Sequence, residues 1–232
     1  MGSSTLEEVL GATRAVLFDF DGPVCDVFAG LPAHGVAMNL ARTVASLDAN
    51  LGGKARAMDD PMEILRLAPQ GGESVLRGIE DALTSAEVAA VKVAGAPISG
   101  AVGALEAAHS SGRKVAVVSN NSKECVREFL SRHDLGHLVH EVVGRAAYRP
   151  DLMKPAPHSL LLAAQRLGIA PERCTLIGDS VTDIEAADAA GAMAIGYANK
   201  PGKDLALTEA GANAVVTEMA AVALALASTP YG

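Results

Sequence analysis

Four short groups of polar residues suggest what chemistry this sequence can do. They are Asp19-Phe-Asp21-Gly22, Ser119-Asn120-Asn121, Lys154-Pro155, and Gly178-Asp179-Ser180-Val-Thr-Asp183. Carboxylates brought together from separate segments repel one another unless a cation holds them. Oxygen ligands without histidine or cysteine favour Mg²⁺ over Zn²⁺. The sequence therefore predicts a magnesium site that includes Asp19, Asp21 and Asp179.

The same groups can bind and transfer a phosphoryl unit. Lys154 supplies a positive charge, Ser119 supplies a hydroxyl donor, and backbone N–H groups after Asp19 and Ser119 can complete an anion cradle. Asp19 is then a carboxylate nucleophile that attacks phosphorus. Asp21 protonates the leaving oxygen and afterwards activates water. Mg²⁺ and Lys154 would stabilise the charge on the transferring group, which is where most of the catalysis is expected.

Asn120 and Gly22 complete the predicted phosphate-binding residues, together with Ser119 and Lys154. Asn120 follows Ser119 directly and is the second candidate for binding phosphate, whereas Asn121 can serve purely as a turn residue. Gly22 follows Asp21 and lets the backbone turn tightly beside the metal.

The elements that must position these groups are strands and helices in alternation. Apolar runs predict buried strands at residues 15–18, 114–118, 138–143 and 174–177, with weaker candidates at 192–196 and 214–216. Helical patterns follow at 101–110, 123–133, 158–167 and 182–190. This order predicts an α/β fold with a doubly wound, parallel, Rossmann-like sheet. Ligands bind at the carboxyl edge of such sheets, so the four groups are expected to meet there.

The stretch between the first strand and residue 96 breaks this alternation. Helical patterns at 34–48, 62–67, 73–83 and 85–93 occur there without a strand of comparable quality. We expect a helical cap of residues 29–95 inserted into a catalytic core of residues 1–28 and 96–232. Its predicted hinges lie near Val27–Pro32 and Gly95–Ser99. The cap should select the substrate, and Lys54 and Arg56, in a Gly-rich connection, are the first candidates for contacting an anionic leaving group.

Length and composition limit the class of protein. The chain has 232 residues, of which 50% are hydrophobic, and a net charge of −8, which argues against a nucleic-acid partner. Three widely spaced cysteines predict reduced, packed thiols rather than disulfides or a zinc site. No signal peptide is visible, and the apolar stretch Met219–Ala227 is about half the roughly 20 residues that span a bilayer. We expect a cytoplasmic monomer or homodimer without a membrane partner.

The four groups, in this order, resemble the signatures of the haloacid dehalogenase-like superfamily. The resemblance covers about Thr13 to Glu218 and is to the branch whose helical cap follows the first strand. It implies that Asp19 is both nucleophile and metal ligand, and that Asp21 is the acid/base and binds metal through its carbonyl oxygen. It further implies that Asp179 binds metal and that Asp183 supports the metal or the lysine.

One position departs from the family pattern. Pro23 stands where the family has a threonine, which removes a hydroxyl and one N–H from the loop. We expect activity to survive, because none of the four charged roles is lost.

Three functions are compatible with these residues. The leading prediction is a Mg²⁺-dependent phosphatase that hydrolyses a small phosphorylated metabolite, such as phosphoglycolate or a sugar phosphate, through an aspartyl phosphate. A phosphosugar mutase of the β-phosphoglucomutase type shares all four signatures. A non-catalytic phosphate-binding module would be expected to lose the nucleophile or the acid, and both are retained. A dehalogenase is disfavoured because that chemistry does not require Asp21.

Overall fold

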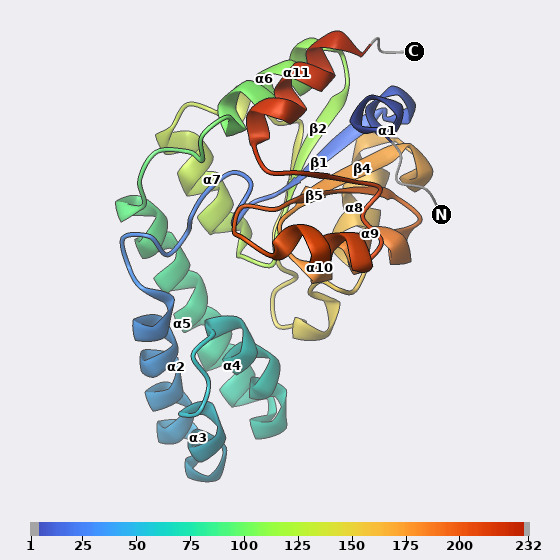
Figure 1. Cartoon of the computed structure of the whole chain (residues 1–232). Coiled ribbons are helices and arrows are strands. Elements are labelled where there is room, and N and C mark those ends of the chain that lie inside the picture. Colours follow the sequence, from blue (N-terminus) through green and yellow to red (C-terminus); the bar gives the residue numbers. More distant parts are fainter. Residues whose placement is uncertain (1–4, 230–232) are drawn as a thin grey trace.

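A parallel β-sheet forms the centre of the molecule in the computed structural model, which describes residues 5–229 (Figure 1). Within these residues the sheet has six strands in the order β3-β2-β1-β4-β5-β6. The strands are β1 (Ala15–Asp19), β2 (Lys114–Val118), β3 (Glu141–Val143), β4 (Cys174–Gly178), β5 (Met193–Tyr197) and β6 (Ala214–Val216). Because β1 lies between β2 and β4, the residues that follow these three strands are neighbours at one edge of the sheet.

Helices cover both faces of the sheet, as the continuous apolar strands predict. One face carries α1 (Leu6–Ala12), α6 (Ala101–Ser110), α7 (Lys123–Arg132) and α11 (Met219–Ser228), and the other carries α8 (His158–Leu167), α9 (Val181–Ala190) and α10 (Lys203–Glu209). Successive residues of β1 pack on opposite faces of the sheet. Val16 and Phe18 lie in the hydrophobic core under α1, α6, α7 and α11, and Ala15 and Leu17 lie in the core under α8, α9 and α10. The predicted α/β fold with a doubly wound sheet is confirmed.

Local signals explain where the helices next to the site begin and end. The side chain of Ser122 accepts a hydrogen bond from Cys125 N–H and so caps α7. Ser180 and Asp183 form a reciprocal capping box at the start of α9. Helices α8 and α9 end at Gly168 and Gly191, both in the left-handed conformation that glycine adopts readily.

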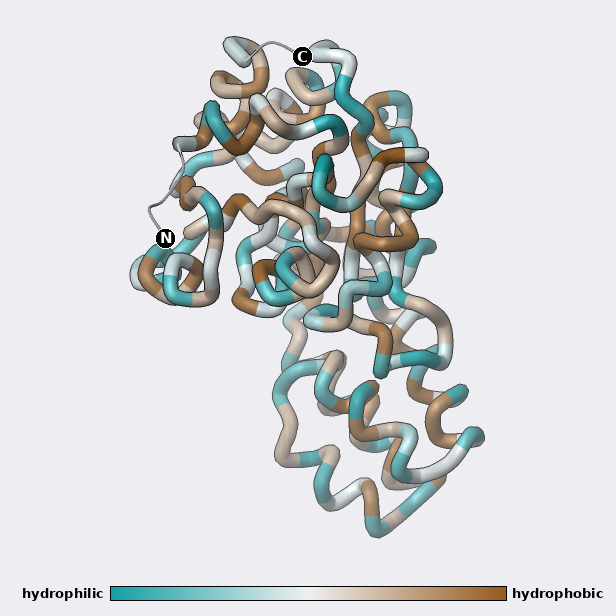
Figure 2. The backbone as a smooth tube through the Cα atoms, turned by 90° about the vertical axis from the view of Figure 1, so that its right-hand side faces the viewer, coloured by the Kyte–Doolittle hydropathy of each residue, from teal (hydrophilic) through white to brown (hydrophobic). Residues whose placement is uncertain are grey.

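A second lobe consists of helices alone. It contains α2 (Ala33–Leu47), α3 (Ala49–Ala55), α4 (Pro61–Leu67) and most of α5 (Gly72–Val93), packed around their own hydrophobic cluster. Figure 2 shows hydrophobic and hydrophilic segments alternating along these helices, as expected when one face of each helix is buried. The last residues of α5, Ala90 and Val91, pack instead into the core of the sheet lobe. The division into a core of residues 1–28 and 96–232 and a cap of residues 29–95 stays a prediction, and its extreme ends, residues 1–4 and 230–232, lie outside the described residues.

Three sequence predictions about single elements were wrong. The strand predicted over 138–143 is only Glu141–Val143, because Gly136–Leu138 forms a short 3₁₀ helix before it. The two helices predicted at 73–83 and 85–93 are one helix, since the Ser85 hydroxyl bonds to the Asp81 carbonyl within α5 rather than breaking it. The expected loop around Lys54 is part of α3, which Asp48 caps.

Cys25, Cys125 and Cys174 are unpaired and buried, as predicted, and burial raises the pKa of each thiol. Within residues 5–229, none of the helices combines the length and the apolar character that crossing a lipid bilayer requires.

Candidate active site

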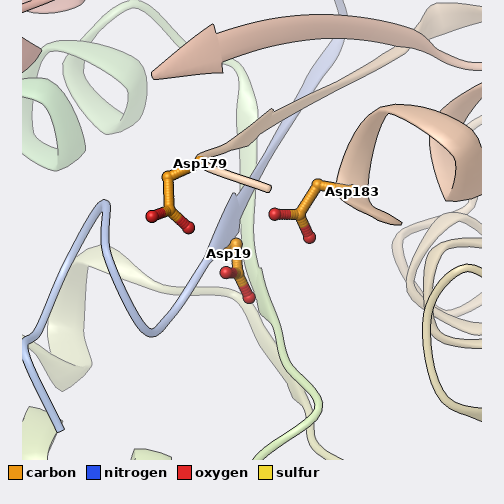
Figure 3. A group of neighbouring side chains, drawn as sticks. All are labelled: Asp19, Asp179 and Asp183. Carbon is orange, nitrogen blue, oxygen red and sulfur yellow. The ribbon is translucent and has the colours of Figure 1, made fainter. Parts of the chain in front are cut away.

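Three aspartates meet at the carboxyl edge of the sheet. Asp19 is the last residue of β1, Asp179 follows β4 directly, and Asp183 lies in the first turn of α9. One carboxylate oxygen from each lies within 4.8 Å of the others. Figure 3 shows the three carboxylates around a common space. Asp19 and Asp179 were expected to meet because each lies at the end of a strand. The structure places them together, with Asp183 as a third member of the group.

Two glycines allow the carboxylates to lie this close to the backbone. A Cβ on Gly22 would lie 2.4 Å from the Asp179 carboxyl carbon, and Gly22 has a φ of +112°. A Cβ on Gly178 would lie 2.4 Å from the Cβ of Asp183. Both contacts are far shorter than real Cβ contacts, so a larger residue at either position would displace an aspartate of the group.

Lys154 lies between two of these aspartates. Its Nζ is 2.6 Å from Asp19 Oδ1 and 2.5 Å from Asp183 Oδ1, and the residue is only 2% exposed. Burial alone would lower the pKa of Lys154, but the carboxylates of Asp183 and Asp19 outweigh it and the net shift is upward. The lysine is therefore held as an ammonium ion in contact with Asp19.

The backbone of Lys154 is fixed by two side chains. Asn120 accepts a hydrogen bond from Lys154 N–H (2.8 Å) and donates one to its carbonyl (3.3 Å). Arg66, from α4, donates a further bond to the same carbonyl (2.9 Å). The side chain of Asn120, predicted to bind phosphate, thus holds the lysine loop in this structure while also lining the pocket.

Ser119 follows β2 and is tied into its own loop. Its N–H donates to the Val143 carbonyl (2.9 Å), and its hydroxyl donates to Asn121 Oδ1 (3.1 Å) while accepting from Asn121 N–H (3.0 Å). The hydroxyl lines the same pocket as Asp19 and Lys154. Rotation about one bond would redirect its proton toward an anion there.

Asp21 lies in the pocket but outside the group of three carboxylates. Its Oδ1 accepts a hydrogen bond from Val27 N–H (3.0 Å). The pKa of Asp21 is raised to about 6, mainly by burial; the bond from Val27 N–H lowers it, and the nearby Asp179 adds to the increase. Burial, with Asp183 adding to it, also raises the pKa of Asp19, although Lys154 opposes the shift. Asp21 is thus suited to exchange a proton near neutral pH, and metal binding through its carbonyl oxygen stays a prediction.

Two residues that contact Asp179 were not predicted from the sequence. Lys203 Nζ lies 2.5 Å from Asp179 Oδ2 and also donates to the Asp179 carbonyl, and Asn199 Nδ2 donates to the same carboxylate oxygen (2.9 Å). Both residues follow β5, which is the next strand after β4 in the sheet. The rule that ligands bind at strand ends could therefore have found them.

The pocket that contains Asp19, Asp21 and Lys154 has a volume of about 180 Å³. Within the described part of the chain its lining includes a single residue from the helical lobe, Met62 of α4. Lys54, expected to meet an anionic leaving group, instead donates to Gln70, and its helix α3 lies at the far tip of the helical lobe (Figure 1). Neither Lys54 nor Arg56 lines the pocket, so that expectation was wrong.

The donor set suits a divalent cation. Asp19, Asp179 and Asp183 carry three negative charges, against the two positive charges of Lys154 and Lys203. Within residues 5–229, Asp19 Oδ2 and Asp179 Oδ1 have no hydrogen-bond partner in the protein. Oxygen-only donors with excess negative charge are what hard divalent cations prefer. This acidic cluster can therefore hold a metal ion.

Comparisons with known proteins agree with this geometry. The sequence model of the haloacid dehalogenase-like hydrolase family matches residues 13–191. Phosphoglycolate phosphatase of Salmonella paratyphi A is 37% identical over 107 residues, which is 45% of this chain and 42% of that protein. The Escherichia coli K12 phosphoglycolate phosphatase is also 37% identical, over 41% of this chain and 36% of its own length. The matches thus span less than half of these relatives.

Solved structures resemble nearly the whole chain. A haloacid dehalogenase family hydrolase from Deinococcus radiodurans, with bound phosphate and sodium, is 28% identical with a TM-score of 0.59, covering 95% of this chain and 99% of that one. A putative β-phosphoglucomutase from Thermotoga maritima has a TM-score of 0.63 at 24% identity, over 92% and 98% of the two chains. The second likeness shows the fold alone.

Proposed function

The chain belongs to the haloacid dehalogenase-like hydrolase family, and from this premise we propose that it is a Mg²⁺-dependent phosphatase acting on a small phosphorylated metabolite. The observation that supports this most directly is the contact of Lys154 with Asp19 inside an acidic pocket that also holds Asp21. It combines a carboxylate nucleophile, a fixed cation and a second carboxyl group whose pKa is about 6.

The proposed reaction starts with attack of an Asp19 carboxylate oxygen on the phosphorus atom. The bond from phosphorus to the leaving oxygen breaks, and Asp21 gives that oxygen its proton. Asp21, now a carboxylate, then accepts a proton from the water that hydrolyses the aspartyl phosphate. A carboxyl group with a pKa of about 6 can perform both transfers near neutral pH.

The other residues bind and orient the phosphoryl group. Lys154 would pair with its oxygens, and Ser119 and Asn120 line the same pocket with a hydroxyl and an amide. Asp19 and Asp179 would hold Mg²⁺ through their open oxygens, with Asp183 orienting Lys154. When bound, Mg²⁺ would supply further stabilisation of the negative charge on the transferring group.

The size of the pocket is compatible with a small leaving group. A volume of about 180 Å³ accommodates a phosphoryl group with a short organic portion, and the phosphoglycolate phosphatases named above make phosphoglycolate the first substrate to test. A mutase would convert a hexose 1-phosphate into the 6-phosphate, whereas a phosphatase would release free phosphate. Product analysis with a hexose 1-phosphate therefore separates the two activities.

Replacement of the nucleophile tests the proposal. Asp19→Asn should reduce Mg²⁺-dependent phosphate release from phosphoglycolate and from an aryl phosphate by about 10³-fold or more, because the amide is a poor nucleophile. Asp59→Asn is the matched control, since Asp59 lies on the surface and pairs with His34. Retention of activity by Asp19→Asn, or no turnover by the unmodified protein across a panel of phosphate esters, would overturn the proposal.

A further inference from the structure

Three charged side chains are buried between the long helix α5 and the loops of the sheet lobe. They are Glu80 and Glu87 of α5 and Arg145, which follows β3, and we refer to them as the α5 ion cluster. Glu87 is 0% exposed, and Arg145 and Glu80 are 7% and 4% exposed. Charges buried to this degree are costly unless each is paired and hydrogen-bonded. The position of such a cluster therefore calls for an explanation.

The guanidinium of Arg145 makes contacts on both sides of this interface. Its Nε donates to Glu80 Oε1 (2.8 Å) and its Nη1 donates to Glu87 Oε1 (2.8 Å), both on α5. The same Nη1 donates to the carbonyl of Asn120 (2.7 Å), on the loop after β2. One rigid, planar group thus fixes the distance between helix α5 and that loop.

Glu87 makes the same connection independently. Its Oε1 accepts a hydrogen bond from Asn121 Nδ2 (3.2 Å), and its Oε2 accepts one from Ser122 N–H (2.9 Å) at the start of α7. Asn121 in turn bonds the Ser119 hydroxyl, and Asn120 holds the backbone of Lys154. Glu87 thus contacts Asn121, which lines the acidic pocket, and is linked to Asn120 through Arg145.

The helix that carries these carboxylates belongs to the helical lobe for most of its length. Val75, Ile79 and Leu83 of α5 pack in the hydrophobic cluster of that lobe. Figure 1 shows α5 running from beside α2 and α4 to the sheet lobe near α7. A displacement of the helical lobe along α5 would consequently be transmitted to the loop of residues 119–122.

We propose that Glu87 and Arg145 are positioning residues that couple the placement of the helical lobe to that of the phosphate-binding loop, residues 119–122. The proposal rests on the proposed function, because it assigns that loop the binding of the phosphoryl group. Glu87 and Arg145 would not touch the substrate. They would hold Ser119 and Asn120 where these residues can bind it, and would bring α4 with Met62 over the pocket at the same time.

The test compares Glu87→Gln with Glu73→Gln in the full-length protein. Glu73 lies on the same helix but is exposed, and its partner is Arg77, one turn away. In Glu87→Gln, an amide NH₂ must face either Arg145 or Ser122 N–H, both of which are donors, so the loop should move. We expect the dissociation constant for inorganic phosphate, measured by calorimetry with Mg²⁺ present, to rise about 10- to 100-fold. Glu73→Gln should leave it unchanged.

A second measurement separates positioning from a general loss of stability. At a temperature where circular dichroism shows the variant to be fully folded, the amide of Ser122 should exchange with deuterium faster in Glu87→Gln than in the unmodified protein. This readout does not require turnover or phosphate binding. If the unmodified protein neither binds phosphate nor hydrolyses esters, the proposed function fails, and unchanged exchange at residues 119–122 would additionally overturn the coupling.

Arg145→Lys covers the case in which Glu87→Gln does not fold. Lysine keeps the positive charge but cannot reach Glu80, Glu87 and Asn120 in one planar arrangement. The same rise in the phosphate dissociation constant is expected, with a decrease in kcat. A folded Arg145→Lys or Glu87→Gln variant with normal phosphate binding and normal exchange would show that the cluster serves stability alone.

Discussion

The acidic pocket and the α5 ion cluster contain the same kinds of groups and differ in how those groups are satisfied. The pocket has four aspartates, three of which pair with two lysines, and the cluster has two glutamates and one arginine, so both carry excess negative charge. In the cluster, each glutamate oxygen accepts a hydrogen bond from the protein. In the pocket, Asp19 and Asp179 each keep one oxygen without such a partner, within the described part of the chain.

This difference separates a structural site from a site for a ligand. Both places carry excess negative charge, so the sign of the charge does not distinguish them. The two places differ in whether the carboxylate oxygens already accept hydrogen bonds from the protein. A buried charge that the protein already pairs and hydrogen-bonds gains little from an added ion. The open oxygens of the pocket would gain a metal ion's attraction, whereas the cluster has no free ligand atom to offer.

The largest effects are expected from removing the cation at each place. Lys154→Met and Arg145→Met should each lower the free energy of unfolding by about 3–5 kcal/mol without metal, since each leaves buried carboxylates uncompensated. Addition of Mg²⁺ should restore part of the loss in Lys154→Met only. Urea unfolding in EDTA and in Mg²⁺ measures both quantities. Equal restoration in the two variants would remove the distinction between the sites.

The response of the unmodified protein to metal is the next effect in size. At a Mg²⁺ concentration of 100 times its dissociation constant, the free energy of unfolding should rise by about 2.7 kcal/mol. Asp179→Asn should abolish most of this gain, and Glu73→Gln, on the surface of α5, should retain it. A gain that survives in Asp179→Asn would place the ion elsewhere.

A smaller effect with the opposite sign is expected at Asp21. Its pKa is raised from 3.8 to about 6 on folding, so the folded state holds the proton more tightly than the unfolded state does. The ionised carboxylate therefore destabilises the fold once the pH rises above about 4, and fully above about 6. Asp21→Asn should be more stable than the unmodified protein by about 1–3 kcal/mol at pH 7.5 in EDTA.

The pH dependence supplies the check on that prediction. The stability advantage of Asp21→Asn should shrink as the pH falls from 6 toward 4. At pH 4 residue 21 is uncharged in the folded state of both the variant and the unmodified protein. The exposed neighbour Asp26 is the control, and Asp26→Asn should change stability by less than about 0.5 kcal/mol. An advantage that does not depend on pH would show that ionisation of Asp21 is not its cause.

The sequence was informative where a short motif follows a strand. Asp19 and Asp179 end or follow buried apolar runs, so the meeting of their carboxylates could be predicted from the topology of a parallel sheet. Asn199 and Lys203 follow the same rule, but the apolar run of β5 is only a weak strand candidate, so the loop after it was not predicted to hold site residues. Asp183 was predicted as a supporting residue; it contacts Lys154 in the structure, and its supporting role stays a prediction.

The α5 ion cluster could not be found in this way. Glu87 and Arg145 are 58 residues apart and belong to no motif, and each alone is typical of a solvated helix or loop. Their pairing depends on the angle at which α5 meets the sheet lobe, which single-sequence patterns do not determine. The prediction of a loop around Lys54 was wrong for a related reason. The cap at Asp48 and tertiary packing outweigh the low helix propensity of Gly52 and Gly53.

The most direct test of the account is to ask where the phosphoryl group goes. The protein would be mixed with phosphoglycolate and Mg²⁺, quenched in acid within one turnover, digested and analysed by mass spectrometry. We expect a peptide that carries one additional PO₃ unit on Asp19. This labelled peptide should be absent from Asp19→Asn. Turnover without any labelled aspartate, or a label on another residue, would contradict this expectation.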